Sequence, residues 1–163
     1  MTDERHRRTP TPEQLRIWRG FVETSATLRE RLAAQLQNSS ALSTGDYQVL
    51  LALSEAPGHT ARSSELAAVI DWERSRLSHH LGRMEKRGLV RRAPCADGAH
   101  GVDVHLTDEG AAAFRSANVP HLRAIRDLFV DALSPEQLAA IDDVSTALRR
   151  HLDGDGDGGS GRR

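Results

Sequence analysis

The chain has 163 residues, a formal net charge of −1 at pH 7 and a single cysteine. Its length supports one domain, or one domain with a dimerisation extension, and its near-zero charge excludes a uniformly basic nucleic-acid binder. A lone cysteine excludes an intramolecular disulfide, and neither a signal peptide nor a run of about 18 apolar residues is recognisable, so we expect a cytoplasmic protein without a membrane span.

The N-terminal part predicts a polar, disordered segment at 1–10 and then a long helix. Thr11, Pro12 and Gln14 make a helix start, because Thr caps, Pro suits the first helical position and Gln completes a capping box. Up to residue 40 the apolar residues recur at helical spacing on one side. This stripe can pack on the domain's own core or on a second subunit, and consists of Leu15, Trp18, Val22, Leu28, Leu32 and Leu36.

A second helix is predicted at about 45–55, started by residues 43–46 and ended by Pro57 and Gly58. A short helix follows, which Ser63 or Ser64 is expected to cap. After a break at Asp71–Trp72, a further helix is predicted from about Glu73 to Arg87, with its apolar stripe at Leu77, Leu81 and Met84. The pair has the order of a helix-turn-helix.

The polar face of the predicted 73–87 helix indicates nucleic-acid binding. With the apolar stripe buried, Ser75, His79, Gly82 and Lys86 point away from it. A local basic patch accompanies this face: Arg74, Arg76, Arg83, Lys86, Arg87, Arg91 and Arg92. Such a patch is typical of a surface that meets phosphates, and the alternative is a solvated face in an arginine-rich protein.

Two β-type runs follow, at Leu89–Arg92 and Val102–Leu106. Pro94, Gly98 and Gly101 lie between them, so we expect a hairpin with a loose tip. Helix, turn, helix and hairpin predict a winged helix-turn-helix. The fold class is therefore expected to be mainly α with a small β-hairpin wing.

The C-terminal part predicts more helix. Thr107 is expected to cap one helix, which Pro120 should break or kink, and residues 134–137 start another. This gives helical dimerisation segments at 11–40 and 111–152, a DNA-binding winged helix-turn-helix at 41–110 and a disordered tail at 153–163. The last helix carries a second apolar stripe: Leu138, Ile141, Val144, Leu148 and Leu152.

The alternative to a DNA-binding protein is an enzyme, since the chain has eight histidines. His79 and His80 are adjacent and diverge by about 100° on a helix, so they are poor joint ligands. Asp103 and His105 share one face of a strand and form the best local pair for a metal or a general base. We predict no catalytic residues, no metal and no cofactor, the alternative being a small metal-dependent or hydrolytic enzyme that uses the wing histidines.

Several segments together resemble the MarR family of bacterial transcription regulators: Leu42-Ser43-Thr44, Ser64-Glu65-Leu66-Ala67, Arg83–Val90 and Val104–Gly110. The resemblance covers about residues 12–152. It implies a homodimer, formed by the interlocking first and last helices, on palindromic double-stranded DNA. It also implies a ligand-responsive repressor, released by a small aromatic or phenolic effector that lies between the dimerisation helices and the DNA-reading part.

Positions in the predicted winged helix-turn-helix also assign roles to single residues. Base edges in the major groove are assigned to Ser75, Arg76, Ser78 and His79, and phosphates to Ser64, Arg74, Arg83, Lys86 and Arg92. His100 is the candidate for the minor groove, because the Asp-x-Arg usual at this wing tip is here Asp97-Gly98-Ala99-His100-Gly101. The candidate effector residues are Trp18, Arg19 and Tyr47, although Trp18 and Tyr47 also fall on stripes expected to form core. The effector, the operator and the direction of regulation stay open.

Overall fold

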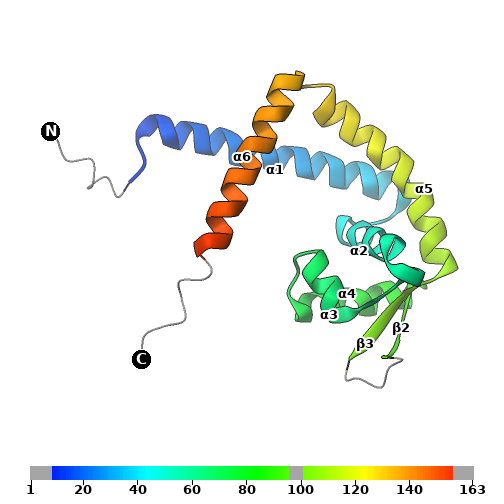
Figure 1. The fold of residues 1–163 in the computed structure, drawn as a ribbon. Helices are drawn as coiled ribbons and strands as arrows, with labels where there is room; N and C mark the ends of the chain where they lie inside the picture. Colours follow the sequence, from blue (N-terminus) through cyan, green and yellow to red (C-terminus); the bar gives the residue numbers. More distant parts are fainter. Residues whose placement is uncertain (1–8, 96–100, 156–163) are drawn as a thin grey trace, which may run out of the picture. The chain divides into compact units, whose positions relative to one another are not determined.

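The computed structural model describes residues 9–95 and 101–155 (Figure 1). It divides into two compact units, residues 1–124 and 125–163, which are treated separately. Their elements are, in chain order, α1 (Pro12–Ser40), α2 (Thr44–Glu55), η2 (Pro57–His59), β1 (Thr60–Arg62), α3 (Ser63–Val69), α4 (Arg74–Lys86), β2 (Val90–Pro94), β3 (Val102–Leu106), α5 (Asp108–Ile125), η3 (Arg126–Val130) and α6 (Pro135–Asp155). The predicted fold class, mainly α with a small β wing, is confirmed.

The helix starts follow the predicted capping chemistry in α1 and α2. The Thr11 hydroxyl accepts from the backbone N–H of Gln14, whose side chain accepts from the N–H of Thr11. Ser43 and Asp46 make the same reciprocal pair at α2. Each pair satisfies two backbone groups that the first helical turn leaves without partners.

The prediction that Ser63 or Ser64 caps α3 is wrong. The N-cap is Arg62, and its side chain makes no capping bond. The reason is that β1 runs directly into α3, so Arg62 is already the extended residue before the helix. Ser63 and Ser64 then become the first two helical residues.

The sheet has three antiparallel strands in the order β1-β3-β2. The β2–β3 hairpin, called the wing below, confirms the predicted one, with Val90 opposite Leu106 and Arg92 opposite Val104. β1 is a further strand, which is not predicted from the sequence. It pairs with β3 at Thr60 opposite His105, so the strands flank the helix-turn-helix from both ends of its sequence.

The core of the first unit is built on the predicted stripe of α4. Leu77, Leu81 and Met84 are all buried there. They pack in one hydrophobic cluster with buried residues of α1, α2, α3, the sheet and α5, among them Leu36, Leu50, Leu53, Leu66, Val104 and Phe114. The core therefore fixes α4 from its inner side and leaves its outer side exposed.

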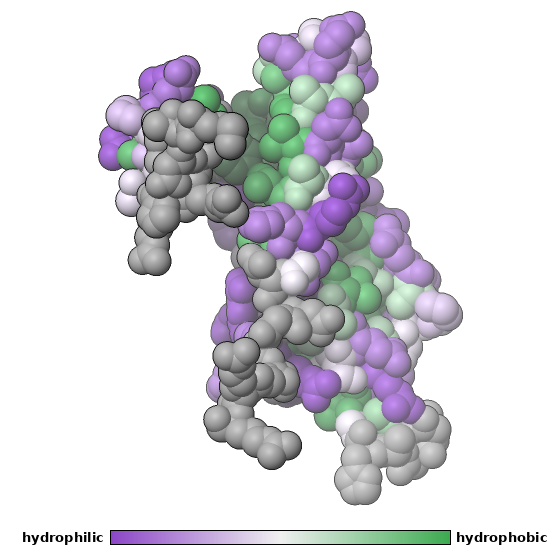
Figure 2. Space-filling model, turned by 60° about the vertical axis from the view of Figure 1, so that its left-hand side comes forward, coloured by the Kyte–Doolittle hydropathy of each residue, from purple (hydrophilic) through white to green (hydrophobic). Residues whose placement is uncertain are grey.

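The apolar stripe of α1 divides into two parts. Leu36, near the C-terminal end of the helix, is buried in the core, whereas Trp18 is 59% exposed. The other large apolar residues of the N-terminal half are exposed as well: Leu15, Ile17, Phe21 and Val22. Figure 2 shows such apolar surface, in green, interrupting the hydrophilic exterior of the helices.

α5 continues through Pro120, so the expected break is not present. Gln35 of α1 donates from Nε2 to the carbonyl oxygen of Pro120, at 3.5 Å, which joins the two helices at this point. No helix among residues 9–95 and 101–155 is both long and apolar enough to cross a membrane.

The second unit contains η3 and α6. The expected start of α6 is confirmed, because the hydroxyl of Ser134 accepts from the N–H of Gln137 and the reciprocal bond is present. The helix extends to Asp155, so the expectation of disorder from residue 153 is wrong for residues 153–155. Large apolar side chains are exposed along it, at Ile141, Val144, Leu148 and Leu152.

Candidate nucleic-acid interface

The turn between α3 and α4 is tight because one residue takes a left-handed conformation. Asp71 has φ of 53°, which Asp tolerates better than most residues. The next N–H, of Trp72, donates to the carbonyl of Ala67 at 2.9 Å. The turn therefore packs back on α3 and sets the direction in which α4 starts.

The outward face of α4 brings together the residues predicted to read bases. All of them are exposed: Ser75, Arg76, Ser78 and His79. Farther along the same helix Arg83 and Lys86 are exposed too, with Gly82 half-buried between the two groups. Hydroxyl, imidazole and guanidinium groups thus stand together on the first half of the exposed face, and two further cations follow them.

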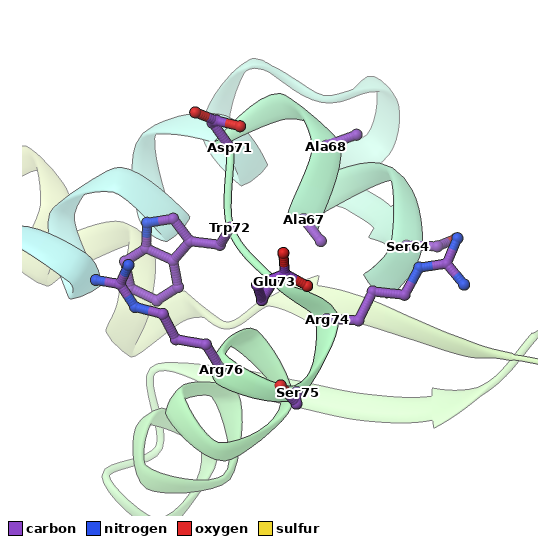
Figure 3. Close-up of a pocket in the computed structure, with 9 residues that line it drawn as sticks. All are labelled: Ser64, Ala67, Ala68, Asp71, Trp72, Glu73, Arg74, Ser75 and Arg76. Carbon is purple, nitrogen blue, oxygen red and sulfur yellow. The ribbon is translucent and has the colours of Figure 1, made fainter. Parts of the chain in front are cut away.

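A hollow lies between α3 and the first turn of α4 (Figure 3). Nine residues line it: Ser64, Ala67, Ala68, Asp71, Trp72, Glu73, Arg74, Ser75 and Arg76. In the close-up Ser64 and Arg74 lie near each other on one side, and Arg76 reaches Trp72 on the other. Ser64 and Arg74, both predicted to hold phosphates, are therefore neighbours although ten positions separate them.

Arg76 does not extend freely from α4. Its Cζ lies 3.9 Å from the centroid of the Trp72 ring, which is a cation–π contact. From the sequence, Trp72 is predicted only as part of the turn between the two helices. The sequence does show an aromatic residue four positions before an arginine, which is compatible with a cation–π contact. The contact also depends on the direction of both side chains, which the sequence does not give.

Asp46 connects the start of α2 to α4 and was not among the predicted site residues. It is 2% exposed, and its Oδ2 accepts from Arg87 Nη1 at 2.7 Å and from the N–H of Ser43 at 2.9 Å. Burial raises the pKa of this carboxyl, but the bonds from Arg87 and Ser43 outweigh it and hold the pKa below the usual 3.8. Asp46 is thus a buried carboxylate that keeps its charge.

His80 is held between Asp46 and Arg83. Its Nδ1 lies 2.8 Å from Arg83 Nη2, and because a guanidinium only donates, Nδ1 accepts and the proton sits on Nε2. Nε2 lies 3.0 Å from Asp46 Oδ1, although its N–H is poorly aligned for a hydrogen bond. Burial lowers the pKa of His80 more than the Asp46 charge raises it, with Arg83 and Arg76 adding to the decrease, so the ring is neutral at pH 7.

Arg92 is placed differently from the expectation of a phosphate contact. Its Nε, Nη2 and backbone N–H all donate to the Glu85 carboxylate, at 2.8–2.9 Å. These bonds hold the pKa of Glu85 below its usual value. The guanidinium therefore ties the wing to α4, and a phosphate would compete with Glu85 for it.

The end of α4, the wing and the start of α5 meet at Thr107. Its Oγ1 lies 2.6 Å from the carbonyl oxygen of Gly88 and 2.9 Å from that of Leu89, and it accepts from the N–H of Gly110. A Cβ on Gly110 would collide with the Leu89 carbonyl. This explains why Thr and Gly stand in the Leu106–Gly110 segment, and it confirms Thr107 as the cap of α5.

The two histidine candidates of the wing have different outcomes. His100 lies outside the described residues. His105 is close to Thr60, with Nδ1 2.9 Å from its Oγ1, rather than directed to a metal. Within residues 9–95 and 101–155 no three His, Cys, Asp or Glu side chains gather as a metal-binding group.

The structure does not bring the three candidate effector residues together. Tyr47 is buried, donates its hydroxyl to Asn118 Oδ1 at 2.7 Å, and packs on Phe114 and His121 of α5. Trp18 and Arg19 are exposed on α1. Gln35 is the α1 residue that contacts α5, and Trp18 lies 17 positions before it. At 1.5 Å per residue this is about 26 Å along the helix.

The chain is similar to known regulators in sequence and in fold. Residues 42–99 match a family model described as MarR family. The HTH-type transcriptional regulator PecS of Dickeya dadantii (strain 3937) is 25% identical over 134 residues, which cover 82% of this chain and 80% of that protein.

Two solved structures from Streptomyces coelicolor extend the similarity over nearly the whole chain. AbsC, a MarR family transcriptional regulator, is 35% identical with a TM-score of 0.84, over 90% of this chain and 99% of that one. Sco3205, a MarR family regulator in complex with DNA, is 34% identical with a TM-score of 0.84, over 89% and 91% of the two chains. On this similarity, and on its winged helix-turn-helix, the chain belongs to the MarR family of transcriptional regulators.

Proposed function

We propose that the chain regulates transcription by inserting α4 into the major groove of a specific double-stranded DNA site. The observation that carries the proposal is the exposed polar and cationic face of α4 over a buried apolar stripe. Sco3205, at 34% identity, is a relative whose structure is in complex with DNA. The enzyme alternative has no such support, since the relatives are transcription regulators.

The proposed roles follow from where each side chain lies on its helix and from the bonds that it already makes within the protein. Ser75, Arg76, Ser78 and His79 read base edges, because the early residues of a recognition helix enter the groove. Ser64, Arg74 and Lys86 hold phosphates, and Arg74 and Lys86 form no ion pair within the described residues. Arg83 and Arg92 are proposed as weaker phosphate contacts, since His80 and Glu85 already engage them. His100 is kept as the proposed minor-groove residue.

We propose a homodimer that binds a palindromic site. Five exposed large apolar residues on α1 and four on α6 form surfaces that a monomer leaves in contact with water. A two-fold dimer places its recognition helices about 34 Å apart, one turn of DNA. Such a protein acts in the bacterial cytoplasm, where it competes for promoter DNA as a repressor.

The proposed effector is a small aromatic or phenolic compound, and the structure changes the proposed contacts. Gln35 Oε1 and His121 Nδ1 are buried without a hydrogen-bond partner, and the His121 ring packs at a tilt of 59° against Tyr47, with ring centroids 4.6 Å apart. A phenolic hydroxyl can donate to either atom. Tyr47 is therefore the best supported of the three candidates. Trp18 and Arg19 contact the effector only if the second subunit of a dimer brings them close to it.

In-vitro selection of DNA sequences by the purified protein tests the DNA proposal, followed by affinity measurements over a range of salt concentrations. We expect a palindromic consensus and a steep loss of affinity with salt, because bound phosphates release counterions. Arg76→Ala should relax the preference at one or two base pairs by about 1–3 kcal/mol each, whereas Lys86→Ala should weaken all sequences and flatten the salt slope by about 1. If selection returns no consensus, or if both variants act alike on every sequence, the proposal or its assignment of roles is wrong.

A further inference from the structure

The indole of Trp72 is fixed from two sides. Its ring meets the ring of His80 edge to face, with centroids 5.1 Å apart and planes at 84°. On the α2 side the space is so tight that a Cβ on Gly45 would lie 2.7 Å from Cη2 of Trp72 and 2.9 Å from Cε1 of His80. With its backbone N–H bonded to Ala67, the residue has little room to change its orientation.

His80, in turn, is not free to move away from the indole. Arg83 donates to its Nδ1, and Asp46 lies 3.0 Å from its Nε2. Asp46 is anchored at the start of α2 by Ser43 and by Arg87. The indole therefore belongs to a connected set of side chains that joins the first turn of α2 to the middle of α4.

The guanidinium of Arg76 lies on the face of this fixed ring, 3.9 Å from its centroid. Arginine has a large side-chain conformational entropy, and a cation–π contact stabilises one orientation of its guanidinium. The ring therefore removes part of the entropy loss that Arg76 would otherwise incur on binding. It occupies one face of the planar group and leaves the N–H groups at the edge free to donate.

We propose that Trp72 is a positioning residue that pre-orients Arg76 to donate in a bidentate manner to guanine O6 and N7. The inference rests on the proposed DNA-binding function and adds a specificity determinant that does not itself touch DNA. Guanine is the base concerned, because its two major-groove acceptors match the edge of a guanidinium. The conformation of the turn residue thus controls the reading of one base pair in each half-site.

Two other roles for Trp72 give different results. If the indole only fills space in the helix-turn-helix, its loss lowers stability and weakens binding to all sequences equally. If it holds Arg76 away from the groove, its loss raises sequence preference. Only the positioning role makes its loss resemble the loss of Arg76 itself at the same base pair.

The test uses the full-length protein and the DNA site selected by the wild type. The variants are Trp72→Leu, Trp72→Phe, Arg76→Ala and the double variant Trp72→Leu/Arg76→Ala. Each is measured on the selected duplex, on duplexes with every base-pair change in one half-site, and on unrelated DNA. We expect Trp72→Leu to reduce discrimination by about 3- to 30-fold at the G·C pair that Arg76→Ala affects. Unrelated DNA should be bound with unchanged affinity, and the double variant should be no worse than Arg76→Ala.

Trp72→Phe is the matched control, because it keeps an aromatic face at the same position. Its discrimination should stay within about three-fold of the wild type. If Trp72→Leu does not fold, as judged by its thermal transition, the test rests on Trp72→Phe. A Trp72→Phe variant that loses as much discrimination as Arg76→Ala overturns the inference. Equal weakening on all DNA, additive single effects or increased discrimination by Trp72→Leu overturn it as well. If the wild-type protein itself shows no sequence preference, the result refutes the proposed function instead.

Discussion

The Arg87 guanidinium donates to the Asp46 carboxylate at 2.7 Å across 41 positions of sequence. Asp46 is the third residue of α2, and Arg87 follows the last residue of α4. The same guanidinium donates from Nη2 to the carbonyl of Ala41, just after α1. One arginine thus connects the end of α4 to the junction between α1 and α2.

Replacing Asp46 by Asn should destabilise the protein by about 1–3 kcal/mol. Asn keeps an acceptor for the Ser43 N–H but removes the charge that faces Arg87 and His80. The loss should stay below that of a fully buried ion pair, because the Arg87 side chain is 44% exposed and water can solvate it. Urea unfolding of both proteins measures the difference.

Glu13→Gln provides the control for Asp46→Asn. Glu13 pairs with Arg16 at 3.5 Å on the exposed side of α1, so its loss should change stability by less than about 0.5 kcal/mol. An Asp46→Asn variant as stable as Glu13→Gln would show that the buried pair contributes little.

Stability should fall as the pH decreases below 6.5. Burial lowers the pKa of His80, and likewise that of His121, from the usual 6.5. Between the folded-state pKa and 6.5 the unfolded chain binds more protons, so this contribution is complete above pH 6.5 and is lost as the pH falls towards the folded-state value. Urea unfolding between pH 5 and 8 should show this slope.

His80→Gln should flatten the slope without abolishing it, because His121 remains. His79→Gln changes an exposed histidine on the same helix and should keep the slope of the wild type. A His80→Gln variant with an undiminished slope would show that other groups cause the pH dependence of stability.

Gly110→Ala should destabilise the first unit by about 1–3 kcal/mol or more. The added methyl group would strike the backbone carbonyl of Leu89, which cannot move without disturbing the start of the wing, and would press on Leu106 Cδ1 at 3.0 Å. Thermal unfolding measures the effect. Gly154→Ala, with no atom within 4 Å of the new methyl group, should shift the midpoint hardly at all, and equal shifts would contradict the steric argument.

Phe21→Glu should shift the protein towards the monomer at micromolar concentration. Phe21 is 55% exposed on α1, and in a two-fold interface each substitution appears twice, which places two like charges in one apolar contact. Sedimentation velocity distinguishes the two states. Thr27→Glu adds the same charge about 120° around the helix and should leave the dimer intact. A Phe21→Glu variant that stays dimeric would move the interface away from this face.

Local patterns were sufficient to predict the helices and the wing. The stripe of Leu77, Leu81 and Met84 repeats at helical spacing, and capping pairs lie three positions apart, so both are visible in short windows of sequence. The outward face of α4 follows from the same periodicity. The family resemblance indicated a DNA-binding transcription regulator, and the similarity to solved regulators confirms that function, whereas the role of this face stays a prediction.

Contacts between distant positions were not predictable in this way. β1 has only three residues and owes its existence to pairing with β3 more than 40 positions later. The link between Asp46 and Arg87, and the burial of His80, depend on how α2 packs on α4. Proline disfavours a helix interior locally, yet α5 continues through Pro120, so of the predicted break or kink only the break is contradicted.

The three oxygen and nitrogen contacts of Thr107 give the wing a mechanical property. One hydroxyl is shared by the end of the α4–β2 connection and the first turn of α5, so neither can rotate without the other. A rotation of the first turn of α5 is therefore coupled through this hydroxyl to the segment that directly follows α4. We therefore expect a change in the direction of α5 to change the direction of α4 as well.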